Sequence, residues 1–122
     1  MCVILVVSRK IKDSGKRLKY LSGMYRDTTD GKPDFYLLIP KGMPYEQQLL
    51  TRCGHHMAEG AKKYSERNWE QANGIEELER FKSSAFRHFM QWLTEENDED
   101  HAAAVVFNIN AAEFVKWKIS KE

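Results

Sequence analysis

The residues DEDHAAAVVFNINAAEFVKWK, from Asp98 to Lys118, give the clearest indication of how this chain folds. The segment contains no Gly or Pro, its middle is rich in Ala, and its first residues are acidic, as the dipole at a helix N-terminus favours. We therefore expect a helix over Asp98–Lys118. Its large apolar residues cannot share one stripe, and such a helix lies between others or contacts a second subunit. These residues are Val105, Val106, Phe107, Ile109, Phe114 and Val115.

Two further helices are expected before it. From Pro44 to about Tyr64 apolar residues recur close to every 3.6 residues, and Pro44 suits a first helical position. The turn-forming residues Ala72–Gly74 separate this helix from another over Glu76–Leu93. One face of the Glu76–Leu93 helix carries Leu78, Phe81, Ala85, Phe89, Trp92 and Leu93.

Amphipathic helices bury their apolar faces most simply against one another. The predicted fold class is therefore all-α, a bundle of three main helices behind an irregular basic N-terminal arm. A tryptophan from each segment is expected to add to the core: Trp69, Trp92 and Trp117. Because so small a bundle has a third helix that is apolar on several sides, we expect a homodimer or a higher homo-oligomer to complete it.

The first 43 residues are expected to form the irregular arm. Asp30–Pro33 predicts a loop, because Gly supplies positive φ and Pro disfavours helix before it. Phe35–Pro40 indicates a brief extended segment or the start of the first helix. Cys2–Val7 is apolar and predicts a short strand or an arm that docks on a partner subunit. The whole chain is expected to be one domain, with the arm at 1–43 and the bundle at 44–122.

Composition excludes several classes of protein. Of the 122 residues, 42% are hydrophobic and 30% charged, which favours a packed globular domain. The net charge of +1 argues against a general binder of nucleic acids or membrane surfaces, and no segment is apolar enough to span a membrane. Two cysteines form no disulfide framework, so we expect a cytoplasmic protein. Residues 1–41 carry nine basic and four acidic side chains (+5), and 42–122 carry ten and fourteen (−4).

Polar residues fall on the inward faces of the expected helices. His101 and Asn108 are seven residues apart and share one face, with Asp100 beside it. His88 lies on the inward stripe of its helix, next to Arg87. An unpaired buried polar group costs about 1–3 kcal/mol, so these groups need partners. Imidazoles and carboxylates from facing helices form metal sites in bundles, and a carboxylate-rich site suits Mg²⁺ or Mn²⁺.

Each of these residues also has a plainer interpretation. A single inward histidine such as His88 is more often a hydrogen-bonded core residue, and an acidic run such as Glu95–Asp100 is more often solvated. His56 lies at the inward edge of its helix, and His55 is expected to share a neighbouring face with Glu59. No zinc-protease, zinc-finger, P-loop or dinucleotide-binding motif is present. The residues alone indicate a helical domain with a candidate cation site.

Four strings in fixed order resemble a known family. They are Glu59–Tyr64 (EGAKKY), Arg67–Glu70 (RNWE), Ser84–Phe89 (SAFRHF) with Trp92 one turn on, and Asp98–Ala104 (DEDHAAA) running to Asn108. Together they resemble the phage dATP/dGTP diphosphohydrolase family (MazZ-like), which is related to the MazG-like all-α nucleoside triphosphate pyrophosphohydrolases. The similarity extends forward to Gly23, Arg26-Asp27 and Gly31–Pro33, and so covers roughly residues 14 to 118.

The resemblance implies an enzyme that uses Mg²⁺ or Mn²⁺ to cleave a purine deoxynucleoside triphosphate between the α and β phosphates. The products are the monophosphate and pyrophosphate, and in a phage the activity reshapes the deoxynucleotide pool of the host cytoplasm. MazG-like relatives hold their metals with E-x-x-E and E-x-x-D motifs. This chain departs from that pattern, because Lys62 stands three residues after Glu59.

The resemblance and the charge of a triphosphate together suggest a site. The catalytic residues expected are Asp100, His101 and Arg87. The metal ligands expected are Asp98, Asp100, His101, Glu59 and His88. The substrate-binding residues expected are Arg26, Lys32, Lys63, Asn68, Trp69 and Asn108, with Trp69 either stacking on the purine or closing the core. Two other hypotheses stay open: a non-catalytic purine nucleotide-binding module and a phage structural or assembly protein.

Overall fold

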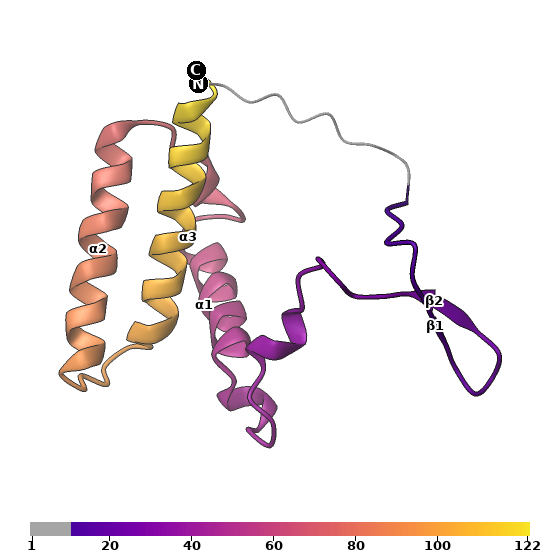
Figure 1. Ribbon diagram of the computed structural model, residues 1–122. Coiled ribbons are helices and arrows are strands. Elements are labelled where there is room, and N and C mark those ends of the chain that lie inside the picture. Colours follow the sequence, from indigo (N-terminus) through magenta and orange to yellow (C-terminus); the bar gives the residue numbers. More distant parts are fainter. Residues whose placement is uncertain (1–10) are drawn as a thin grey trace. The chain divides into compact units, whose positions relative to one another are not determined.

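The computed structural model describes residues 11–122, which form two units, 11–40 and 41–122 (Figure 1). The apolar segment Cys2–Val7, predicted as a strand or docking arm, lies outside the described residues. Each unit is described by itself below. Residues 41–122 hold the three helices and residues 11–40 hold the two short strands.

The unit 11–40 contains a strand pair that the sequence analysis did not predict. Strand β1 (Arg17–Lys19) pairs antiparallel with β2 (Tyr25–Asp27), and the turn between them is closed by Gly23, whose N–H donates to the carbonyl of Tyr20 at 2.9 Å. Gly23 has φ of 94°, which only glycine adopts without strain. Strands of three residues are too short to show an alternating pattern, so the prediction of an irregular arm was wrong here.

The end of this unit also differs from expectation. Phe35–Leu38 is a 3-10 helix, whereas the sequence analysis predicted an extended segment or the start of the first helix. Asp34 explains the change, because its carboxylate accepts a hydrogen bond from the N–H of Tyr36 at 3.2 Å and so caps the turn.

The unit 41–122 confirms the prediction of three main helices in a mostly helical fold. Helix α1 spans Leu49–Lys63, α2 spans Ile75–Leu93 and α3 spans His101–Ser120. Short 3-10 helices at Tyr45–Gln47 and Asn68–Gln71 precede and follow α1.

Two predicted helix starts were wrong. Helix α1 begins at Leu49 and not at Pro44, because the residues between them form the 3-10 turn. Helix α3 begins at His101 and not at Asp98, because the carboxylate of Asp100 accepts from the N–H of Ala103 at 3.1 Å and caps the helix.

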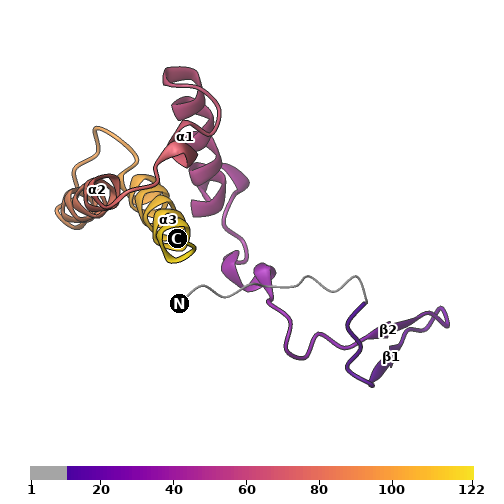
Figure 2. The same ribbon diagram turned by 90° about the horizontal axis from the view of Figure 1, so that it is seen from above.

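Helix α3 lies between the other two helices. It packs against both α2 and α1, and Figure 2 shows α2 and α3 nearly end-on while α1, on the other side of α3, runs at an angle to them. The buried positions of α3 are mostly small, which allows close approach of its neighbours. They are His101, Ala103, Ala104, Asn108, Ala111, Ala112 and Val115.

The core is smaller than the tryptophans suggested. Trp92 and Trp117 are each about half exposed, at 52% and 51%, so the prediction that both join the core was wrong. The inward face of α2 carries Leu78 and His88, and places Trp92 at its solvent edge. Trp69 is half-buried. No helix within residues 11–122 is long and apolar enough to cross a membrane.

Candidate functional site

Two buried histidines meet where α2 ends and α3 begins. His88 comes from α2 and His101 is the first residue of α3, and their Nδ1 atoms are 2.9 Å apart. Both side chains are buried in the unit. The predicted inward direction of His88 and His101 is therefore confirmed, and they face each other.

The partners of the two imidazoles fix where their protons lie. Nε2 of His101 is 2.7 Å from Oδ1 of Asp98, and the guanidinium of Arg87 is 3.3 Å from Nε2 of His88. A guanidinium can only donate and a carboxylate can only accept. His88 therefore accepts at Nε2 and donates from Nδ1 to His101, and His101 donates from Nε2 to Asp98. The hydrogen bonds therefore run in one direction, from Arg87 to His88, then to His101 and then to Asp98.

Electrostatics favour the neutral form of the His88 imidazole. Burial lowers the pKa of His88, and the adjacent charge of Arg87 lowers it further. The hydrogen bond from His101 lowers the pKa of Asp98, so its carboxylate is ionised at neutral pH. A neutral imidazole keeps a lone pair, which is the form that binds a metal ion.

Carboxylates surround the histidine pair closely enough for a metal centre. His88, Glu99 and His101 form one set, and Glu96, Asp98 and His101 form another; within each set the potential ligand atoms lie within 4.8 Å of one another. Glu96 and Glu99 were not singled out from the sequence, because nothing in the run of acids distinguishes those that turn toward His101.

Glu59 has a different position from the one predicted. It is exposed and pairs with Lys62 at 3.2 Å, and neither potential metal set includes it. His55 lies on α1 four residues before Glu59, as predicted, but its hydrogen-bond partner is Glu46, with Nε2 of His55 2.7 Å from Oε2 of Glu46. The 3-10 turn before α1 carries Glu46 back to His55, which a continuous helix would not do.

Asp100 connects α3 to α1. Its two carboxylate oxygens accept from Nε and NH2 of Arg52 at 2.7 and 2.9 Å, in addition to capping α3. This hydrogen bond from Arg52 lowers the pKa of Asp100, and burial opposes it only in part. The sequence analysis missed Arg52; its place four residues before His56, on the same inward edge, was the available signal.

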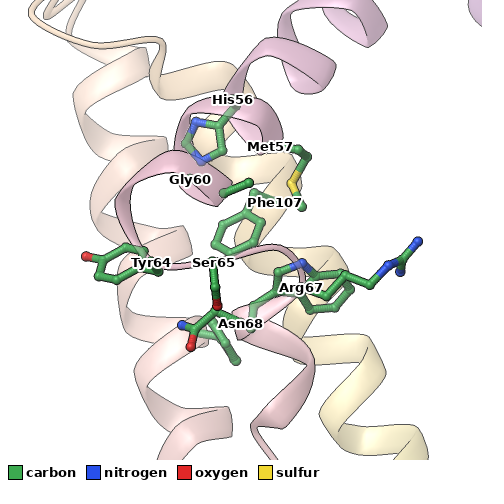
Figure 3. A pocket seen from close by; sticks show the side chains of 11 residues that line it. His56, Met57, Gly60, Tyr64, Ser65, Arg67, Asn68 and Phe107 are labelled. Atoms are coloured by element: carbon green, nitrogen blue, oxygen red, sulfur yellow. The ribbon is translucent and has the colours of Figure 1, made fainter.

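An aromatic cavity of about 270 Å³ lies beside α1, where the chain turns into the 3-10 helix Asn68–Gln71 (Figure 3). Phe107 of α3 forms its floor. The centroid of its ring lies 5.4 Å from that of His56, 6.1 Å from that of Trp69 and 6.2 Å from that of Phe81. The full lining is His56, Met57, Gly60, Ala61, Tyr64, Ser65, Arg67, Asn68, Trp69, Phe81 and Phe107.

His56 links the cavity to the polar side chains around Asp100. Its ring lines the cavity, and on α1 it lies one turn after Arg52, which donates to Asp100 beside His101. The aromatic cavity is therefore a neighbour of the polar cluster in the unit 41–122. By polar cluster we mean the side chains of Arg52, Arg87, His88, Glu96, Asp98, Glu99, Asp100 and His101.

Four of the six predicted substrate-binding residues belong to the unit 41–122 and lie in three places there. Asn68 and Trp69 line the cavity, as a binding role requires. Asn108 is buried, but its amide donates to the carbonyl of Ala104 at 2.8 Å and so turns back onto its own helix. Lys63 is exposed, with its ammonium over the ring of Tyr64.

Arg26 and Lys32 belong to the separate unit 11–40. There Arg26 lies on β2, opposite Leu18, and Lys32 pairs with Asp27 at 3.4 Å. Their role at the substrate stays a prediction.

A sequence model described as dATP/dGTP diphosphohydrolase, N-terminal, matches residues 22–120. The chain belongs to this family. The match confirms the resemblance drawn from the four strings, and it includes every residue of the polar cluster and of the cavity. Neither a curated protein nor a solved structure matches the chain.

Proposed function

We propose that the chain hydrolyses a purine deoxynucleoside triphosphate to the monophosphate and pyrophosphate, with a divalent cation, and so acts on the deoxynucleotide pool. The observation that carries this proposal is the buried His88–His101 pair with its carboxylates, in a chain of the dATP/dGTP diphosphohydrolase family. A triphosphate carries about four negative charges, which its site has to neutralise.

The donor set of the cluster bears on the choice of cation. Imidazole ligands suit transition-metal ions better than Mg²⁺, which prefers oxygen ligands and retained water, and Mn²⁺ also accepts carboxylates. Of the two cations expected, Mn²⁺ therefore fits the cluster of His88, His101 and Glu99 better. When bound, such an ion supplies charge neutralisation at the phosphates and activation of water.

The chain's own residues have separable roles in this proposal. Asp98 holds the proton of His101 at Nε2, which directs the Nδ1 lone pair toward His88. Ligation by His88 through Nδ1 requires its proton to move to Nε2, where it would face the donors of Arg87. Arg87 is then free to donate to a phosphate oxygen, the role that its charge suits best. Asp100 acts as a positioning residue, because it holds Arg52 and the start of α3.

Product analysis with the purified chain tests the proposal. Each of the four deoxynucleoside triphosphates is incubated with Mn²⁺ or Mg²⁺, and the monophosphate and pyrophosphate are resolved. We expect turnover of dATP or dGTP, and its loss in His88→Ala and His101→Ala. The matched control is His55→Ala, because His55 is exposed and pairs with Glu46 outside the cluster.

Two results would contradict the proposal. Purine triphosphates that persist unchanged with both cations would exclude hydrolysis; saturable nucleotide binding alongside would then indicate a non-catalytic module. If His55→Ala and His101→Ala lose activity equally, the cluster is not the catalytic centre.

A further inference from the structure

The aromatic cavity has the dimensions and surface of a base-binding subsite. Its volume of about 270 Å³ lies just below the range of about 300–1,000 Å³ for small-molecule sites, so it can hold a ring system but not a whole triphosphate. Flat side chains form its walls, with Trp69 and Phe107 edge to face at 6.1 Å. Aromatic walls of this kind stabilise nucleobases by stacking, which is sequence-tolerant because every base has a π-face.

We propose that this cavity binds the purine ring of the substrate, with Asn68 reading N7 of the purine. The inference rests on the proposed function, since it places the base of the same nucleotide whose phosphates reach the histidine cluster. His56 connects the two regions, because its ring lines the cavity and it lies one turn after Arg52, which donates to Asp100 at the start of α3.

The amide of Asn68 has a donor available for such a contact. Its Oδ1 accepts from Nε2 of Gln71 at 3.3 Å, and no residue between 11 and 122 accepts from its Nδ2. Asn68 lines the cavity and is exposed at its rim (Figure 3). Both purines present N7 as an acceptor, and pyrimidines have no equivalent atom. A donor at this position therefore distinguishes purines from pyrimidines.

Backbone strain at the rim supports a binding role. Ser65 and Arg67 both line the cavity and both have positive φ, at 154° and 57°, which is uncommon for residues other than glycine. Such conformations persist where the surrounding structure holds them, and they cluster at ligand sites. Here Lys118 of α3 donates to the carbonyls of Glu70 and Ala72 and so fixes the 3-10 helix that follows Arg67.

Nucleosides test the subsite without phosphate or metal. Deoxyadenosine, deoxyguanosine, deoxycytidine and thymidine are titrated into the ¹⁵N-labelled full chain, and the indole N–H signals of the three tryptophans are followed by NMR. We expect a saturable shift at Trp69 with both purines, at least tenfold weaker binding of the pyrimidines, and little change at Trp92 and Trp117. Equal responses to all four nucleosides, or no response at Trp69, would overturn the inference.

Two glycines of α1 offer a matched pair of variants. A Cβ atom added at either Gly60 or Gly54 meets no atom within 4 Å, but of the two only Gly60 lines the cavity. We expect Gly60→Leu to weaken purine binding more than tenfold, because its side chain fills the cavity, while Gly54→Leu binds like the parent chain. Unchanged binding in Gly60→Leu would place the purine elsewhere.

The contact from Asn68 is tested by removing its partner. In 7-deaza-2′-deoxyguanosine a C–H replaces N7, so we expect about fivefold weaker binding than for deoxyguanosine, the effect of one hydrogen bond. In Asn68→Ala the two nucleosides should bind equally. A preference that persists in Asn68→Ala would exclude Asn68 as the reader of N7. Because these titrations need no turnover, purine binding can be detected even when the hydrolysis assay fails. Likewise, hydrolysis without purine binding in this cavity would exclude the base site and leave the proposed function standing.

Discussion

The polar cluster and the aromatic cavity lie side by side in one unit but are held together by different forces. At the cluster, Asp100 and Arg52 join α3 to α1 by charge-assisted hydrogen bonds, and His88 and His101 join α2 to α3. At the cavity, Phe107 joins α3 to the ring of His56 on α1 and to the rings of Trp69 and Phe81. The chemistry proposed for the polar cluster therefore depends on charge and proton position, whereas the recognition proposed for the cavity depends on shape.

Removal of Phe107 should have the largest effect on stability. Phe107→Ala deletes the ring that contacts three elements, and we expect the free energy of unfolding to fall by about 3 kcal/mol. Denaturant unfolding followed by circular dichroism measures it. Phe107→Leu is the control, because it retains apolar volume and should lose no more than about 1.5 kcal/mol. Equal losses in both variants would show that the ring contacts, and not the volume, hold the cavity.

At the polar cluster, Asp100→Ala should have a smaller effect. The cap of α3 contributes about 1 kcal/mol, and the link to Arg52 adds about as much or less, because both side chains are about a third exposed. We expect a loss of about 2 kcal/mol in denaturant unfolding. Asp100→Asn keeps a capping oxygen and should lose about half of that. A loss below 0.5 kcal/mol in Asp100→Ala would show that α3 starts without this cap.

The two regions also differed in how far the sequence could predict them. His88 and His101 were predicted to point inward because helical spacing places them on apolar faces, and both are buried as expected. The cavity was not predicted, because Phe107 and Trp69 are 38 residues apart in the chain and only tertiary packing brings them together. Asn68 and Trp69 were identified by family resemblance, not by any periodic pattern.

Local exceptions to regular structure account for the errors in the prediction. The 3-10 turn before α1 and the cap at Asp100 shortened two helices at their starts, and both depend on hydrogen bonds that apolar periodicity does not report. Arg52 was missed for a related reason: its partner, Asp100, is 48 residues away. Spacing identifies residues that share a helix face, but it does not identify partners on another helix.

Lowering the pH should reduce the contribution of the polar cluster to stability and leave that of the aromatic cavity unchanged. The pKa of Asp100 lies below its ordinary value of 3.8 because Arg52 donates to it, so its contribution to stability is present above pH 3.8 and is lost as the pH falls further. In metal-free buffer, the difference in unfolding free energy between the parent chain and Asp100→Asn should therefore shrink below pH 3.8. The difference for Phe107→Leu should stay constant over the same range, since no proton is involved. A constant difference for Asp100→Asn would show that its carboxylate does not stabilise α3 through charge.

Replacing Gly54 or Gly60 of α1 by alanine should have the smallest effect on the free energy of unfolding, and it should stabilise the folded state. Glycine within a helix is less stable than alanine by about 0.5–1 kcal/mol, chiefly because the unfolded chain gains freedom. At Gly54 and Gly60 a methyl group meets no atom within 4 Å, so Gly54→Ala and Gly60→Ala should each stabilise the chain by that amount in thermal unfolding. Since only Gly60 lines the cavity, purine binding should weaken in Gly60→Ala alone, by about twofold or less, because a methyl occupies little of the 270 Å³. Stabilisation without any difference in binding between the two variants would show that the α1 wall of the cavity does not contact the purine ring.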